Sequence, residues 1–401
     1  MIGKESVFYA LRNMKHSWAR SSLTIFSIFV GIMTIFIFIS FGWGIYDYVD
    51  DLTSSSSADK LMIQAVGNGM PGMDDAFALT EDDLKSIEKT AGIKEAVGVK
   101  YGVATIKKSG TLKYTFLISL DPENLIMLEM NNIGIDSGRM FSSGETGKVI
   151  LGHNYKIADK IFDKSISLND QIEVNGQSMK VIGFMEEIGN PQDDSQVYIS
   201  DDYFDKILPN SSYAMIIASV EDTKTIKQTI ENVEKSLRKE RGVDEGEEDF
   251  FVTSYQDMLE SFMVALNIII GFVILIALIS VIVSAVNTAN TMITSVLERY
   301  KEIGILKSIG AKNSEIFGIF LFESSVFGFI SGAIGVFLGW VATSLAGIYL
   351  KNMGWGFLQP HYSVSLFAGC ILFAMITGAI SGVIPAYNAS RINTVDALRY
   401  E

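Results

Sequence analysis

The sequence is poor in the residue types from which most active sites are built. Its 401 residues include one cysteine, Cys370, and three histidines, His16, His153 and His361, which lie far apart in the chain. A single cysteine forms no disulfide within the chain, and these histidines do not have the spacing of metal ligands. A disulfide-stabilised fold and a histidine-based metal site are therefore not expected.

Motifs for nucleotide hydrolysis and covalent catalysis are also missing. Residues 144–149 read Gly-Glu-Thr-Gly-Lys-Val, which lacks the spacing and the final Ser or Thr of a phosphate-binding P-loop. The acidic run Asp244–Asp249 lacks the EF-hand pattern, and no G-x-S-x-G motif occurs. We therefore expect a protein that is not an enzyme and has no metal or cofactor of its own.

Charged residues are absent from four long hydrophobic blocks. The blocks are Leu23–Trp43, Ser261–Leu297, Ser324–Leu350 and Ser363–Ser390. A helix of 21 residues is about 31 Å long at roughly 1.5 Å per residue, enough to cross the hydrocarbon core of a bilayer. The sequence thus predicts transmembrane helices at 22–44, 261–288, 315–350 and 364–385, the last ended near the membrane surface by Pro385.

The first block is interpreted as a retained anchor. Its apolar stretch exceeds the roughly 7–15 residues of a signal-peptide core, and no small-residue cleavage motif follows it. Residues 1–21 precede it, with apolar positions at helical spacing and basic residues off that stripe. We expect an amphipathic helix there, lying on the inner leaflet.

Charge is distributed unevenly along the chain. Residues 45–260 carry 21 Lys and Arg against 39 Asp and Glu, whereas the remainder has a net charge of +4. Such an acidic segment argues against nucleic acid as a partner, because phosphates require a basic surface. The cytoplasmic side is indicated by basic residues in 1–21, the connector 289–314 and the tail 386–401, with a single lysine in the short outer loop 351–363. We therefore expect a multi-pass protein of the cytoplasmic membrane, with both termini inside and residues 45–260 outside.

The outer segment is predicted to be a mixed α+β domain inserted between the first two transmembrane helices. Helices are expected from Thr80 to Gly92 and over 222–240, and Asn175-Gly176 predicts a β-hairpin. Ser254 is expected to cap a helix that continues into the second span. Strands are expected at the following apolar runs: 95–106, 112–120, 148–152, 171–184, 196–200 and 213–220.

Glycine pairs four residues apart mark the third and fourth spans. Glycines at this spacing let two helix backbones approach closely in a membrane. They indicate that these two spans pack against each other. The pairs are Gly328 and Gly332, Gly335 and Gly339, and Gly378 and Gly382.

The connector after the second span carries a specific pattern. It reads Glu298-Arg299-Tyr300-Lys301-Glu302-Ile303-Gly304-Ile305-Leu306-Lys307-Ser308-Ile309-Gly310-Ala311. This segment resembles the ER-x-x-EIGI-x-K-x-IGA signature of MacB/FtsX-like ABC transporter permeases. The end of the chain, from Pro385-Ala386 to Ala397-Leu398-Arg399-Tyr400-Glu401, resembles the ending of the same family, with Thr394 in place of a proline. Residues 45–260 contain short segments that resemble its MacB-like periplasmic core domain.

The resemblance implies a function and a set of partners. The chain would be a permease that forms a homodimer, or a heterodimer with a similar permease, and binds two copies of a separate ATP-binding subunit, which holds Mg-ATP. ATP hydrolysis there would drive motion of the outer domain, a mechanism called mechanotransmission, to export or extract cargo. Further partners would be the lipid bilayer and an extracytoplasmic cargo or adaptor protein. The residues that the resemblance assigns to ATPase coupling are Glu298, Arg299, Glu302, Ile303, Gly304, Lys307 and Gly310.

Two alternatives stay open at this point. The same four-span architecture serves signal transducers, whose outer domain regulates a hydrolase or a sensor without transport. A membrane-anchored enzyme is the second alternative, and the missing catalytic motifs argue against it. Glu323 also matches a family glutamate, at the start of the third span; it is either functional or an interfacial residue facing the cytosol.

Overall fold

The computed structural model describes residues 18–54, 58–67, 78–209 and 211–399. The chain divides into two compact units. The helical unit comprises residues 1–45, 265–349 and 358–401, and the outer unit comprises residues 46–264 and 350–357. Most of the amphipathic helix predicted for residues 1–21 falls outside the described residues.

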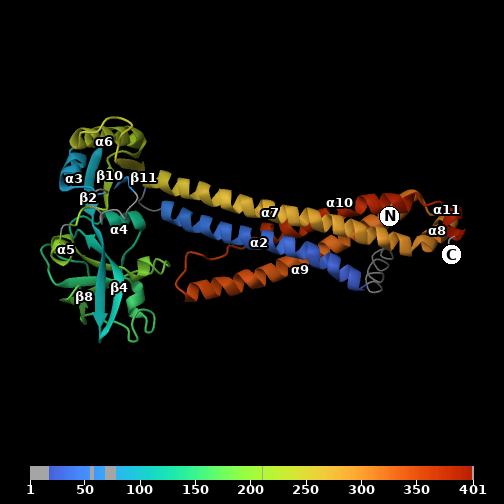
Figure 1. The fold of residues 1–401 in the computed structure, drawn as a ribbon, viewed down its shortest axis with the longest axis horizontal. Coiled ribbons are helices and arrows are strands. Elements are labelled where there is room, and N and C mark those ends of the chain that lie inside the picture. Colours follow the sequence, from blue (N-terminus) through green and yellow to red (C-terminus); the bar gives the residue numbers. More distant parts are fainter. Residues whose placement is uncertain (1–17, 55–57, 68–77, 210, 400–401) are drawn as a thin grey trace. The chain divides into compact units, whose positions relative to one another are not determined.

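Four helices of the described chain are long and apolar enough to cross a membrane. They contain the four hydrophobic blocks found in the sequence, except for Ser363, which caps the N-terminal end of α10. Because α7 is a single helix that starts directly after Ser254, the predicted continuity into the second span is confirmed; the Ser254 hydroxyl accepts a hydrogen bond from the Asp257 amide at 2.9 Å. The helices are α2 (Trp18–Ser54), α7 (Tyr255–Glu298), α9 (Asn313–Asn352) and α10 (Val364–Ser390) (Figure 1).

The prediction that Pro385 breaks the fourth helix is wrong. Helix α10 continues through Pro385 to Ser390. A proline removes one backbone hydrogen bond, and membrane helices tolerate it where neighbouring helices pack around the site. Pro385, Ala386 and Ala389 are all buried, so tertiary packing holds this last stretch of α10 in helical form.

Glycines bring α9 close to two neighbouring helices. A Cβ atom added at Gly378 of α10 would lie 2.5 Å from the Ser324 carbonyl oxygen of α9, and Gly382 also faces Ser324. Gly328 and Gly332 face Ala374 of α10. Gly335 and Gly339, however, face Phe29 and Phe36 of α2. The six glycines therefore line two helix contacts, α9 with α10 and α9 with α2.

The outer unit begins with a four-stranded antiparallel sheet in the order β11-β1-β10-β2. Helices α3 (Glu81–Glu88) and α6 (Ile226–Arg241) contribute to the core on one face of this sheet (Figure 1). Thr80 forms a capping box with Asp83, as the sequence predicts for the start of α3. The strands are β1 (Lys60–Ala65), β2 (Ile93–Val99), β10 (Met215–Val220) and β11 (Phe250–Ser254).

A second sheet closes on itself. Its strand order is β5-β8-β6-β9-β4-β3-β7, and β7 also pairs with β8, which makes a small barrel. Aliphatic and aromatic side chains fill the barrel, among them Ile106, Val174, Val181 and Phe184. The strands are β3 (Tyr101–Lys108), β4 (Thr111–Leu120), β5 (Ile135–Gly138), β6 (Lys148–Leu151), β7 (Gln171–Val174), β8 (Gln177–Met185) and β9 (Val197–Ser200).

Several sequence predictions for this unit change in detail. The β-hairpin at Asn175-Gly176 is confirmed, with both residues at positive φ between β7 and β8. The run 95–106, predicted as one strand, is divided at Lys100 into β2 of the first sheet and β3 of the barrel. Shorter elements complete the fold: α4 (Ile126–Asn131), η2 (His153–Lys156), η3 (Asp193–Ser195), α5 (Asp201–Ile207) and η4 (Thr223–Thr225).

Candidate coupling site

The signature segment folds into a short helix between two spans. Helix α7 ends at Glu298, α8 covers Tyr300–Ser308, and α9 starts at Asn313. Gly310 adopts φ +104°, a left-handed conformation that glycine accommodates without strain. Two backbone hydrogen bonds close α8: the Gly310 amide donates to Lys307, and the Ala311 amide donates to Leu306. This arrangement is a glycine-terminated helix end, which fixes the direction in which the chain enters α9.

One face of α8 is buried against the rest of the helical unit. Ile303 and Gly304 are both buried there. A Cβ atom at Gly304 would lie 2.5 Å from the Cβ of Ala397, which belongs to the C-terminal helix α11 (Thr394–Arg399). The close approach that Gly304 permits is therefore to another helix of this chain. The buried face of α8 contributes Ile303 to an apolar cluster, which consists of Met292, Val296, Ile303, Ile316, Phe320, Phe327, Ala386 and Ala389.

Lys307 fastens α8 to the end of α10. Its ammonium group donates hydrogen bonds to the carbonyl oxygens of Ser390, at 2.9 Å, and Ile392, at 2.7 Å. The last carbonyls of a helix have no partner within the helix and carry partial negative charge, so a lysine is well suited to this position. Lys307 thereby holds α8, α10 and the start of the C-terminal segment together.

Arg299 links the α7–α8 junction to the third span. Its Nη1 lies 3.1 Å from Oε2 of Glu323 in α9, and its Nε lies 3.3 Å from Oε2 of Glu302. The guanidinium also stacks over the ring of Phe320, 5.1 Å from its centroid. The side chains of Arg299 and Glu323 are 13% and 4% exposed, so the pair is largely removed from water. Glu323 is thus buried and paired with Arg299, which argues against a residue that faces the cytosol.

The opposite face of α8 points away from the helical unit. Glu302 is 61% exposed, and Ile305 and Ile309 are 48% and 77% exposed. These three residues recur at helical spacing and so lie along one side of α8 and of its C-terminal cap residue, Ile309. Glu298, at the end of α7, and Val395, on α11, are also exposed. We call Glu302, Ile305 and Ile309 the α8 outer face.

The structure therefore separates the predicted coupling residues into two groups. Arg299, Ile303, Gly304 and Lys307 contact other parts of the chain, and Gly310 ends the helix. Glu298 and Glu302 are exposed. The sequence did not single out Ile305 and Ile309 as coupling residues, because isoleucines next to a hydrophobic span are usually buried. The available signal was their spacing: both follow Glu302 on the same helical face, opposite Ile303.

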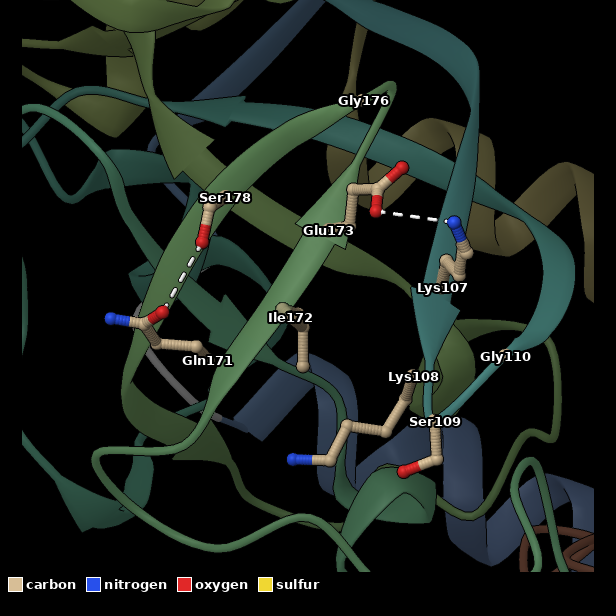
Figure 2. Close-up of a pocket in the computed structure, with 9 residues that line it drawn as sticks. All are labelled: Lys107, Lys108, Ser109, Gly110, Gln171, Ile172, Glu173, Gly176 and Ser178. Atoms are coloured by element: carbon tan, nitrogen blue, oxygen red, sulfur yellow. Dashed lines mark hydrogen bonds and ion pairs between the residues drawn. The ribbon is translucent and has the colours of Figure 1, made fainter.

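The outer unit contains a polar depression, about 340 Å³ in volume, between the β3–β4 and β7–β8 hairpins (Figure 2). Its two lysines are already paired. Lys107 lies 3.4 Å from Glu173, and Lys108 lies 2.8 Å from Asp170. Charge is thus neutralised within the depression, and the arrangement provides no strong site for an anionic or cationic ligand.

Two known protein families match two successive parts of the chain. The profile of the MacB-like periplasmic core domain matches residues 21–236, and that of the FtsX-like permease C-terminal region matches residues 257–394. The chain is 29% identical over 397 residues to the uncharacterized ABC transporter permease MJ1507 of Methanocaldococcus jannaschii, covering 98% of both chains. It is 26% identical over 408 residues to the uncharacterized ABC transporter permease YknZ of Bacillus subtilis, covering 99% of both.

A third relative is larger. The chain is 26% identical to the macrolide export ATP-binding/permease protein MacB of Bdellovibrio bacteriovorus, where 99% of this chain matches 62% of the relative. The chain thus spans about three fifths of that protein, whose name includes an ATP-binding function. Four candidate spans, an α+β domain inserted after the first of them and both family profiles define a membrane subunit of an ABC transporter. The chain belongs to the MacB/FtsX type of ABC transporter permeases.

Proposed function

We propose that the chain couples ATP hydrolysis by a separate ATP-binding subunit to motion of its outer domain, for export or extraction of cargo. The observation that carries the proposal is the construction of α8. Gly304, Lys307 and Arg299 fix its inner face to α11, α10 and α9, so that a force applied to the α8 outer face is transmitted to the spans. An exposed helix with apolar and acidic side chains provides a surface for a soluble partner.

The charge pattern and the resemblance to the family support the remaining features of the proposal. The basic connector and both termini lie in the cytoplasm, where ATP is available, and the acidic domain lies outside. Two copies of the permease, identical or similar, bind two ATP-binding subunits, which hold Mg-ATP. The cargo is handled outside the inner leaflet and need not pass through a channel in this chain.

The test is co-purification with an ABC ATP-binding subunit from the same genome, co-expressed with the chain. Ile309→Asp places a carboxylate on the α8 outer face, and burying it against a partner without a counter-charge is expected to weaken binding by about 30-fold or more, as at an interface hot spot. Ile157→Asp, at an exposed isoleucine of the outer unit, is the matched control and should bind like the wild type. Arg299 is unsuitable for this test, because a change there disturbs its contact with Glu323.

Each outcome bears on the proposal. Retention of the ATPase by the wild type and the Ile157→Asp control, with loss by Ile309→Asp, supports α8 as the coupling site. Binding of the ATPase by Ile309→Asp as tightly as by the wild type contradicts it. If ATPase activity in the complex does not respond to any cargo but the outer domain still binds a hydrolase or a sensor, the signalling alternative is the better description.

A further inference from the structure

The connector between α9 and α10 is divided between the two units. Of the connector residues 353–363, residues 353–357 belong to the outer unit together with the last three residues of α9, whereas residues 358–363 belong to the helical unit. The chain enters the outer unit through α2 and leaves it through α7, and the first half of this connector then returns to it. Specific contacts hold this segment on the outer unit.

The first half of the connector packs backbone against backbone on the outer unit. The Phe357 amide donates a hydrogen bond to the Gly189 carbonyl oxygen at 3.3 Å. A Cβ atom at Gly189 would lie 3.1 Å from the Cα of Gly356, and one at Gly356 would lie 3.2 Å from the Cα of Gly189. Only glycine at both positions permits this distance without displacement of one chain. Gly189 also adopts φ +83°, which disfavours any other residue.

The receiving loop, residues 188–194, is itself held in place. The buried Asp194 carboxylate accepts hydrogen bonds from the amides of Ile188, at 2.8 Å, and Gly189, at 3.0 Å. On the connector side, the Phe357 ring contacts the rings of Tyr48 and Trp355, whose centroids are each 5.6 Å from its own. The contact therefore joins a fixed loop of the outer unit to an aromatic cluster.

The second half of the connector is seated among the spans. The His361 amide donates to the Ser40 carbonyl oxygen of α2 at 2.9 Å. The Tyr362 hydroxyl lies 2.9 Å from the hydroxyls of both Thr343 and Ser344 in α9. Gly44 of α2 faces the backbone of Gln359 so closely that a side chain at this position would collide with it. This half of the connector is thus tied to α2 and α9.

We propose that the α9–α10 connector is a transmission element, which carries movement of the spans to the 188–194 loop of the outer unit. The inference rests on the proposed function, because it assumes that ATP hydrolysis moves the spans. Its physical basis is that both halves are held by backbone contacts. Movement of the second half therefore pulls on the first half through a few covalent bonds, in addition to any movement carried by α2 and α7.

The experiment compares the permease–ATPase complex with three variants in lipid nanodiscs. Gly356→Leu inserts a side chain between the connector and Gly189, and Phe357→Ala removes the ring without adding atoms. Met353→Ala, at an exposed connector residue, is the matched control. Hydrogen–deuterium exchange of 188–194 is measured with and without ATP, together with ATPase retention and the rate of ATP hydrolysis.

We expect exchange in 188–194 to rise roughly 5–30-fold in Gly356→Leu and Phe357→Ala, the range produced by losing a contact of ordinary strength. Both variants should keep the ATPase and hydrolyse ATP, but the ATP-dependent change in outer-domain exchange should fall at least about fivefold. The control should behave like the wild type. Wild-type behaviour of both variants in exchange and in ATP response would overturn the inference.

Two results separate this inference from the proposed function. If the wild type retains no ATPase, the proposed function fails and the transmission role fails with it, whatever the exchange data show. If the wild type responds to ATP and the variants lose protection of 188–194 while keeping a full response elsewhere in the outer unit, only the transmission role is refuted.

Discussion

The ion pair between Arg299 and Glu323 yields the most specific energetic prediction. Its atoms are 3.1 Å apart, and the two side chains are 13% and 4% exposed. At this distance and an effective dielectric constant of about 20, the Coulomb attraction is about 5 kcal/mol. Removing one member of a buried pair costs about 3–5 kcal/mol, because the remaining charge loses its partner.

The two single substitutions should differ in size. Arg299→Met leaves the Glu323 carboxylate buried without the guanidinium, so the free energy of unfolding should fall by about 4–5 kcal/mol. Glu323→Leu leaves Arg299 with Glu302, 3.3 Å away and exposed, so the loss should be nearer 3 kcal/mol. The double substitution replaces the pair with apolar groups of similar size, and it should lie within about 1 kcal/mol of the wild type.

The assay is equilibrium unfolding of the purified chain in mixed micelles with increasing SDS, followed by circular dichroism. The double-mutant cycle then gives the coupling free energy between the two side chains. The reasoning would be refuted by strict additivity, in which the double variant loses the sum of the two single losses. That result would mean that Glu323 is held by groups other than Arg299.

Two further predictions concern packing and pH. Gly378→Ala should lower the free energy of unfolding by about 1–3 kcal/mol, because its Cβ would lie 2.5 Å from the Ser324 carbonyl oxygen. Gly318→Ala, which has open space around it, is the control and should be neutral or stabilising. Equal unfolding midpoints for the two variants would contradict the predicted contact. In the outer unit, the hydrogen bond from Arg139 lowers the pKa of Glu145 from its usual 4.5 to about 2, despite partial burial. The pair therefore stabilises the fold above about pH 4.5 and loses this effect as the pH falls towards 2. Arg139→Gln should remove that part of the pH dependence of the unfolding temperature, and identical pH profiles would count against it.

Much of the fold could be predicted from the sequence, because its signals are local. A charge-free block of 21 residues or more is sufficient to identify a membrane helix, and Asn175-Gly176 encodes a hairpin by its backbone preferences alone. The class of four spans with an inserted α+β domain is confirmed by the structure and by both family profiles. These features require no knowledge of what lies beside them in space.

Other features depend on distant partners and could not be predicted in this way. Strand β1 begins with a lysine and pairs with β10 and β11, more than 150 residues further along the chain. The division at Lys100 follows from the assignment of β2 and β3 to different sheets, which no apolar pattern reveals. In the coupling site, Arg299 reads as a surface charge, and only the position of α9 shows that it faces Glu323.

The order of strands in the four-stranded sheet also determines how the outer unit bears a load. Strand β11 leads directly into α7, and β1 follows α2; in the antiparallel pair, the Lys60 end of β1 lies beside the Ser254 end of β11. A pull along one strand against its neighbour acts on all their registered pairs at once, from Leu61 with Ser254 to Ala65 with Phe250. A sheet pulled apart from one end would instead break its hydrogen bonds one after another. Because both helices join the ladder at the same end, moving α2 apart from α7 would open the ladder from that end, whereas sliding one helix along the other would load it in shear.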